Sequence, residues 1–160
     1  MMDTLNNCDI RFIDSEEWDE AMELVYRTFL EFDAVSFTRE GIDQFREFIA
    51  DNSLKRMFLA GCFQVIGAYD HMKLVGVIAL RDNSHISLLF VDKNYQHHGI
   101  GRKLVMQLAD FAYLKLHQHL LTVNAAPYAI DFYHRIGFKD TSLEIAEHGI
   151  KYTPMKYQLD

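Results

Sequence analysis

The chain has 160 residues, 49% of them hydrophobic, which suits one domain over residues 1–160 that closes its core without disulfides. The net charge of −7, with no basic stripe, excludes phosphate-backbone binding to nucleic acid as the main task and is more compatible with a small cationic substrate. Cys8 and Cys62 lack metal-site spacing, and no charged-then-apolar leader or long apolar run opens the chain, so we expect a cytoplasmic protein that does not bind membranes.

The first fifty residues predict one strand and two helices. DIRFI, residues 9–13, reads as a strand, and Asp14 and Ser15 can cap the helix that follows. Apolar residues then recur at helical spacing: Met22, Val25, Tyr26 and Phe29. A second helix begins near Thr38, with four apolar residues on its buried stripe: Ile42, Phe45, Phe48 and Ile49.

Residues 57–91 have the composition of three strands. Runs of β-branched and aromatic residues alternate with the turn segments DHMK and DNS. The predicted strands are MFLAGCFQVIGAY, LVGVIALR and HISLLFV. Short turns between them indicate an antiparallel meander.

The remaining chain predicts helix, strand, helix and two strands. Residues 99–116 form an amphipathic helix, LLTVN a strand, and Pro127 and Gly137 bracket a short helix, with strands in FKDTSLEI and GIKYTPMKYQL after it. The fold class is therefore a mixed α/β (α+β) domain with a mostly antiparallel sheet of about seven strands and four flanking helices. The crossover from HISLLFV to LLTVN would be a parallel βαβ unit.

The stretch YQHHGIGRKL, residues 95–104, fits an anion cradle, a metal site or an ordinary helix start. Gly99 and Gly101 stand where a helix would present unpaired backbone N–H groups and the positive end of its dipole. The sequence lacks the G-K-[ST] that a P-loop requires, and Leu104 stands where a dinucleotide fingerprint requires a third small residue. Neighbouring histidines point apart and have no further ligand at a suitable spacing, so we expect no metal at His97, His98, His117 or His119.

Two longer motifs carry a resemblance to a known family. LLFVDKNYQHHGIGRKLV resembles the acetyl-CoA motif Q/R-x-x-G-x-G/A of the GNAT N-acetyltransferase superfamily, with Gln96, Gly99 and Gly101 at its defining places. NAAPYAIDFYHRIGFK resembles the second signature of that superfamily, a helix with Tyr133 four residues before Gly137 and Phe138. The order of predicted elements also matches a GNAT-like fold over nearly the whole chain.

The resemblance implies acetyl-CoA as cosubstrate, no metal, and direct attack of an amine on the thioester. Backbone amides of the glycine turn would hold the pyrophosphate, the N–H of Val91 would polarise the thioester carbonyl, and Tyr133 would protonate the leaving thiolate. The residues implied to contact the cosubstrate are Phe90, Val91, Gln96, His98, Gly99, Ile100, Gly101, Arg102, Asn124 and Tyr133.

His85 is the candidate base for removing the proton of the amine. Strand alternation would put it on one face with Ser87, Leu89 and Val91. Some members of the superfamily have a carboxylate at the position of His85, and a histidine titrates near neutrality. A catalytic base, a solvated turn histidine and a water relay without a single base all remain open.

The segment EFDAVSF, residues 31–37, corresponds to the acceptor wall of the superfamily. Glu31, Phe32 and Asp33 could bind a cationic amine with an apolar body, or they could form a packed corner with solvated acids. The resemblance implies an N-acetyltransferase for a primary amine of a small molecule or peptide, as a monomer or homodimer. The alternatives are a non-catalytic acyl-CoA-binding or sensor module and a transferase for a longer acyl donor.

Overall fold

The structure, a computed structural model, describes residues 8–160. Its first half contains three strands among short and long helices: β1 (Asp9–Phe12), η1 (Ser15–Glu17), α2 (Trp18–Thr28), η2 (Phe29–Asp33), η3 (Ala34–Ser36), α3 (Arg39–Ala50), α4 (Asn52–Leu59), β2 (Phe63–Asp70) and β3 (Lys73–Arg81). The second half begins with β4 (His85–Val91), η4 (Lys93–Tyr95), α5 (Ile100–Leu114) and β5 (Leu120–Ala125). It ends with η5 (Pro127–Ala129), α6 (Ile130–Arg135), β6 (Lys139–Asp140), β7 (Ile145–Glu147) and β8 (Ile150–Gln158).

The sheet has the strand order β1-β2-β3-β4-β5-β8-β6, with β7 paired to β8 outside this path. Its pairs are antiparallel except β4 with β5, which are parallel. The predicted fold class and the parallel crossover through α5 are therefore confirmed, but residues 8–160 contain five α-helices where four were expected, because α4 replaces the start of a predicted strand.

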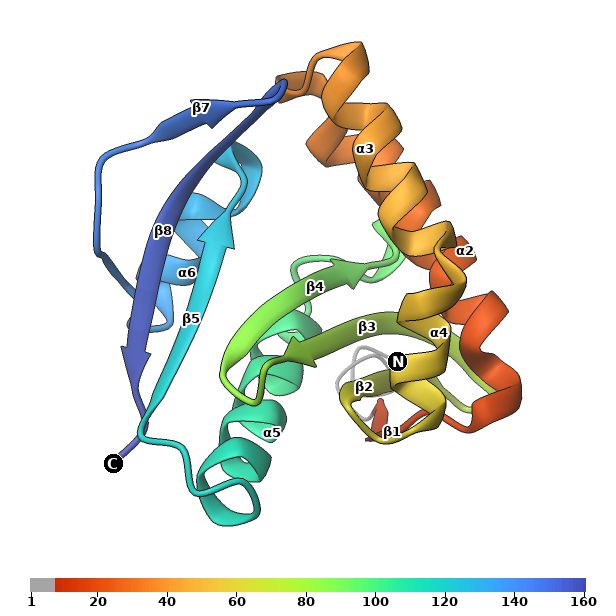
Figure 1. Cartoon of the computed structure of the whole chain (residues 1–160). Helices are drawn as coiled ribbons and strands as arrows, with labels where there is room; N and C mark the ends of the chain where they lie inside the picture. The colour runs from red at the N-terminus through yellow and green to blue at the C-terminus, as the bar shows by residue number, and fades with distance from the viewer. Residues whose placement is uncertain (1–7) are drawn as a thin grey trace.

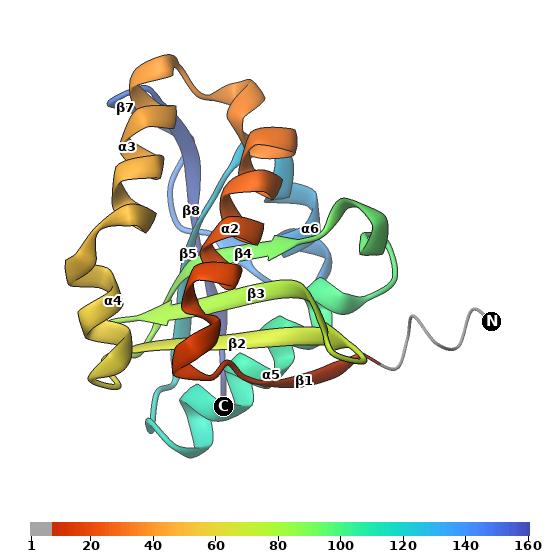
Figure 2. The same ribbon diagram turned by 90° about the vertical axis from the view of Figure 1, so that its right-hand side faces the viewer.

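Helices cover both faces of the sheet, and the hydrophobic core therefore consists of two clusters, one on each face. One cluster joins the sheet to α5 and α6, and the other joins it to α2, α3 and α4. Figure 1 shows α5 on one side of β2–β4 and the three N-terminal helices on the other, and Figure 2 shows α2 in front of the same strands. The apolar stripes that the sequence predicts thus face the sheet from opposite sides.

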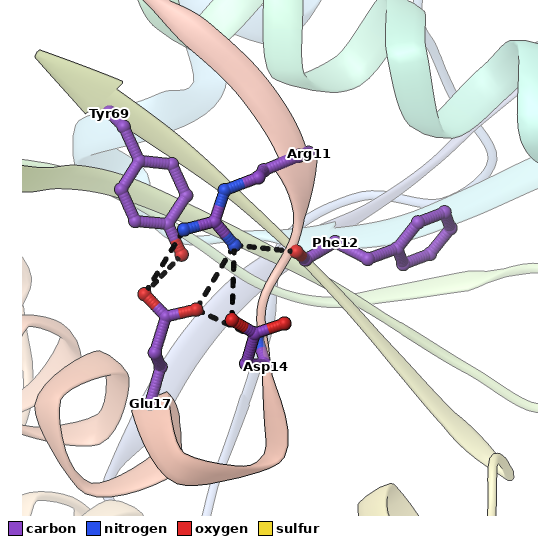
Figure 3. A network of polar contacts seen from close by, with 5 residues as sticks. All are labelled: Arg11, Phe12, Asp14, Glu17 and Tyr69. Carbon is purple, nitrogen blue, oxygen red and sulfur yellow. Dashed lines mark hydrogen bonds and ion pairs between the residues drawn. The ribbon is translucent and has the colours of Figure 1, made fainter. Parts of the chain in front are cut away.

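A network of polar contacts fastens α2 to the edge of the sheet. The Glu17 carboxylate accepts hydrogen bonds from the Asp14 amide at 2.8 Å, from Arg11 at 3.1 Å and from the Tyr69 hydroxyl at 2.9 Å. The Arg11 guanidinium also lies 3.9 Å from the centroid of the Tyr69 ring (Figure 3). Because these residues come from β1, the turn after it and β2, the network fixes where α2 begins.

Two elements differ from the sequence prediction. The strand expected to start at residue 57 starts at Phe63, because residues 52–59 form α4, which Asp51 caps through a hydrogen bond of 2.7 Å from the Ser53 amide. Phe58 of that helix stacks on Trp18, so its apolar residues pack as a helical face. FKDTSLEI, expected as one strand, contributes only the two residues of β6 and the start of β7.

The β7–β8 turn in the second half of the chain contacts the start of α3 in the first half. The amide of Thr38, the residue that caps α3, donates a hydrogen bond of 2.9 Å to the carbonyl oxygen of Gly149 in the β7–β8 turn. A Cβ on Gly41 would lie 2.4 Å from the same carbonyl oxygen, so only glycine fits this contact. The tip of the β7–β8 hairpin consequently rests on the first turn of α3 (Figure 1).

Candidate active site

Strands β4 and β5 separate soon after they meet. They pair only at His85 with Thr122 and Ile86 with Val123, although β4 continues to Val91 and β5 to Ala125. Figure 1 shows the two strands running apart from this shared start. The remaining length of each strand therefore has a backbone edge that the other strand does not pair.

The backbone of Val91 points into the opening between these strands. The Asp92 amide donates to Val75 of β3 at 2.8 Å, and backbone groups of successive residues in a strand point in alternate directions. The N–H and C=O of Val91 are thus directed away from β3, toward β5. This direction is the one that the sequence prediction requires of the Val91 N–H.

Asn124 presents its backbone to the same opening from the other side. It pairs with Pro154 of β8, and the carbonyl oxygen of Pro154 accepts instead from Thr141 on the far side of β8, at 2.8 Å. The pair Asn124–Pro154 is therefore a non-hydrogen-bonded pair, which also explains why a proline is tolerated there. The N–H and C=O of Asn124 face β4, so backbone groups of both strands line the opening.

The glycine turn leads from the end of β4 into α5. Gly99 has φ of +83° and precedes the first helical residue, and a Cβ added there would meet nothing within 4 Å. Gly101 has a different role, because a Cβ there would lie 3.1 Å from the ring of Phe132 in α6. The first glycine supplies a left-handed conformation with open space around it, and the second lets α6 approach α5.

The start of α5 combines backbone donors with positive charge. Gly99, Arg102 and Lys103 border a groove of about 510 Å³ together with Ile10, Met106, Gln107 and Asp110. The side chain of Ile100 is buried in the core, and His98 is exposed. Ile100 can therefore serve a ligand only through its backbone, and the turn has the donors and charge that a phosphate requires.

Gln96, the first residue of the glycine motif, holds the end of β4 in place. Its side-chain Nε2 donates to the carbonyl oxygen of Val91 at 3.0 Å, and its Oε1 accepts from the Tyr128 hydroxyl at 2.7 Å. The side chain thus uses both of its polar atoms on the protein itself. Its position favours an indirect role in binding, through the orientation of Val91.

Tyr133 lies in α6 with its ring buried against the edges of Phe132 and Phe138. Its hydroxyl makes no hydrogen bond within residues 8–160. Burial, with a smaller contribution from the charge of Asp33, holds the pKa of Tyr133 well above its usual value of 10. The hydroxyl therefore remains protonated at neutral pH, as an acid must.

His85 lies at the paired end of β4. Its Nδ1 is 2.8 Å from the Thr122 hydroxyl, and burial, followed by the charge of Arg81, lowers the pKa of His85 below 6.5, against an opposing effect of Asp82. The ring is thus neutral at pH 7. Val91 lies six positions after His85, about 20 Å along a strand at 3.3 Å per residue.

The predicted alternation along β4 is wrong because the strand contains a bulge. Leu80 pairs with Ile86 and Ala79 with Leu88, which leaves Ser87 as an extra residue. Ile86, Leu89 and Val91 consequently pack in the cluster under α5, although strict alternation would separate Ile86 from the other two. His85 therefore does not share a face with Leu89 and Val91.

The predicted acceptor wall lies at the end of α2, where the helix widens into the π-helical turn η2. The ring of Phe32 stacks on Tyr128 of η5 with centroids 5.0 Å apart, while Glu31 is exposed and Asp33 is half-buried. Burial raises the pKa of Asp33 to about 7. The structure thus brings Phe32 and Asp33, but not the side chain of Glu31, against the second half of the chain.

Tyr128 is the site residue that the sequence did not reveal. It joins Phe32 of η2 to Gln96 of the glycine turn, and these residues lie far apart in the chain. Its position directly after Pro127 indicated only a helix start.

The described part of the chain shows neither a cluster of metal ligands nor a membrane-spanning helix. No group of three or more His, Cys, Asp or Glu side chains within residues 8–160 is arranged to hold a metal ion. Over the same residues, no helix has the length and apolar character needed to cross a membrane.

Comparison with known proteins gives one family match. The family model described as "Acetyltransferase (GNAT) domain" matches residues 33–159. No curated protein matches the chain.

Solved structures share the fold over almost their full length. A GCN5-related N-acetyltransferase from Rhodopseudomonas palustris has a TM-score of 0.81 at 20% identity, covering 95% of this chain and 96% of the other. The PaiA N-acetyltransferase of Thermoplasma acidophilum in complex with coenzyme A has a TM-score of 0.78 at 18% identity, covering 95% and 99%. YncA of Salmonella typhimurium with acetyl-CoA has a TM-score of 0.69 at 22% identity, covering 96% and 95%.

Proposed function

The chain belongs to the acetyltransferase (GNAT) domain family, and on that premise we propose that it transfers an acetyl group from acetyl-CoA to a primary amine of a small molecule or peptide. The proposed transferase domain comprises the whole chain, residues 1–160. Similar folds solved with coenzyme A and with acetyl-CoA support the choice of cosubstrate.

The observation that carries this proposal is the pair of backbone edges that face each other across the opening between β4 and β5. Val91 and Asn124 direct their N–H and C=O groups into this opening, and the glycine turn at the start of α5 follows the end of β4. An amide-containing arm such as pantetheine can pair with the strand edges while its phosphates bind the helix start. The site therefore fits CoA by its backbone more than by its side chains.

The chain supplies two groups for the chemistry of thioester aminolysis. The Val91 N–H is directed to where negative charge develops on the thioester oxygen. The protonated Tyr133 hydroxyl, which makes no hydrogen bond within residues 8–160, can donate its proton to the departing thiolate. Acetyl-CoA itself supplies the activated acyl group.

We assign the acceptor to the side of β4 opposite α5. Phe32 and Asp33 offer an aromatic face and a carboxylate there, which suits an ammonium group with an apolar body. Glu31 is exposed and would act only through long-range attraction of a cation. These contacts support an amine as the acceptor and do not require a metal.

Binding and turnover are tested separately. Isothermal titration with acetyl-CoA measures binding, and a thiol-release assay over a panel of primary amines measures transfer. The proposal requires both binding and amine-dependent thiol release. Absence of binding at high micromolar acetyl-CoA would refute it, and binding without release for any amine would identify a non-catalytic acyl-CoA-binding module.

A further inference from the structure

Asp33 carries a carboxylate that has no partner in the described part of the chain. Within residues 8–160 no hydrogen bond or ion pair reaches its side chain, although the residue is half-buried at the end of η2. Its oxygen atoms are not sealed from solvent. A carboxylate held in this way costs free energy in the folded protein unless a cation or proton is supplied from outside.

The surroundings of Asp33 are aromatic and phenolic. Phe32, the preceding residue, stacks on Tyr128, whose hydroxyl donates to Gln96. The negative charge of Asp33 contributes to raising the pKa of both Tyr128 and Tyr133, after the effect of burial in each case. Asp33 is therefore within electrostatic range of the phenol that is proposed to protonate the thiolate.

We infer that Asp33 is the proton acceptor for the attacking amine, and that the acceptor is a primary alkylamine with one positive charge and an apolar body. This inference rests on the proposed acetyl transfer. A single carboxylate next to a stacked aromatic pair recognises one ammonium group and the carbons beside it. Glu31 stands two residues away on a helical turn and so faces elsewhere, and it does not add a second carboxylate beside Asp33.

The proton balance of the reaction is complete with the groups present. The ammonium gives one proton to the Asp33 carboxylate, and the nitrogen lone pair attacks the thioester carbon. The C–S bond breaks, the electron pair leaves on sulfur, and the thiolate takes the Tyr133 proton. The second proton of the new amide nitrogen goes to solvent as the tyrosinate is reprotonated, and Asp33 later releases its proton to solvent.

Two observations favour Asp33 over His85 for this step. His85 lies about 20 Å along β4 from Val91, at the end where β4 and β5 are still paired. Asp33 instead follows Phe32, which stacks on Tyr128, and Tyr128 is hydrogen-bonded to Gln96 at the Val91 end of the strand. Burial raises the pKa of Asp33 to about 7, near the pH at which a general base works best. The titratable groups that face it from other elements, Tyr128 and Tyr133, are neutral at that pH.

The test compares Asp33→Asn with Glu23→Gln, a matched loss of one exposed carboxylate on α2. The acceptors are n-butylamine, which is cationic at pH 7, and 2,2,2-trifluoroethylamine, which is neutral there. We expect Asp33→Asn to lower kcat/KM for n-butylamine by roughly 10²–10⁴-fold while acetyl-CoA binding by titration is unchanged. The defect should shrink to less than ~10-fold with the neutral amine, and it should also shrink as the pH approaches the pKa of n-butylamine near ~10.

Each remaining outcome has a definite meaning. If the wild-type protein is active and Asp33→Asn behaves as Glu23→Gln does, the assignment of Asp33 is overturned and the proposed function stands. Equal loss with both amines would make Asp33 a structural residue. A polyamine with a higher kcat/KM than n-butylamine would refute the single-charge acceptor. A wild-type protein that releases thiol with no amine would overturn the proposed function and the inference with it.

Discussion

Gln96 fixes the carbonyl oxygen of Val91 with a hydrogen bond of 3.0 Å from its side-chain amide. The first residue of the glycine motif thereby orients the last residue of β4, whose N–H is proposed to bind the thioester oxygen. Gln96, five residues after the end of β4, therefore acts on the β4 side of the opening, across from Asn124 of β5. The peptide that joins Val91 to Asp92 is thus held from both sides, by this contact and by the hydrogen bond of the Asp92 amide to Val75.

Replacement of Gln96 should separate its two hydrogen bonds. Gln96→Glu can still accept from Tyr128 but cannot donate to Val91, so we expect kcat/KM for acetyl-CoA to fall by about 10-fold, equivalent to one lost hydrogen bond. Tyr128→Phe removes only the other bond and should have a smaller effect. Gln44→Leu, at an exposed position of α3, serves as the control. A larger effect of Tyr128→Phe than of Gln96→Glu would contradict this account.

Replacement of Tyr133 should slow transfer without weakening cosubstrate binding. The buried phenol stays protonated, and Tyr133→Phe removes only its hydroxyl group, so we expect kcat to fall by roughly 10²-fold or more while the Kd of acetyl-CoA is unchanged. Kinetics together with calorimetric titration measure the two quantities. Tyr113→Phe, on the exposed side of α5, should leave both unchanged. A parallel loss of binding would show that the residue is structural.

The two glycines of the turn should respond to different rescue mutations. Gly101→Ala places a methyl group 3.1 Å from the Phe132 ring, and this overpacking should cost about 1–3 kcal/mol and weaken acetyl-CoA binding. The double variant Gly101→Ala/Phe132→Leu should recover part of that loss. Gly99→Ala suffers from its positive φ, roughly 1–2 kcal/mol, which Phe132→Leu cannot relieve. Urea unfolding and acetyl-CoA titration of Gly99→Ala and Gly101→Ala, each with and without Phe132→Leu, measure stability and binding. Equal rescue of both glycine variants by Phe132→Leu would be evidence against distinct roles.

Removal of the Asp33 charge should stabilise the protein at high pH. Burial raises the pKa of Asp33 from 3.8 to about 7, so its favourable protonated state is lost as the pH rises through about 7. Asp33→Asn does not ionise and should melt higher than the wild type at pH 8.5, by at least ~3 °C for each kcal/mol regained. The difference should vanish below about pH 4. Identical melting curves at pH 8.5 would mean that the carboxylate is better solvated than the structure indicates.

Loss of Glu17 should destabilise the protein with the opposite pH dependence. Burial tends to raise the pKa of Glu17, but hydrogen bonds from the Asp14 amide, Arg11 and Tyr69 lower it below 4.5 overall. The stabilisation is therefore present above about pH 4.5 and is lost as the pH falls through the lowered pKa.

We expect Glu17→Gln to cost about 1–3 kcal/mol of unfolding free energy at pH 7. A double-mutant cycle with Tyr69→Phe should give a coupling energy of at least ~0.5 kcal/mol. Additive effects in urea denaturation would show that the contacts seen in Figure 3 contribute independently.

The sequence determined the elements and the family because both depend on local patterns. Helical and strand periodicity, the cap residue Thr38 and the brackets Pro127 and Gly137 act within a few residues, and the structure confirms the helices that they predict. The prediction of a strand from residue 57 was wrong because Met57, Phe58 and Leu59 fit a strand as well as a helix, and packing of Phe58 on Trp18 favours the helix.

The tertiary structure alone decided which residues meet at the site. Phe32, Tyr128 and Gln96 come from three distant parts of the chain, and no local spacing encodes their contact. The bulge at Ser87 changed which residues of β4 share a face, because register depends on the partner strand. The motifs predicted that a backbone cradle exists, since glycine conformation is local. The isolation of the Asp33 carboxylate could be seen only after folding, because desolvation depends on every group that packs around it.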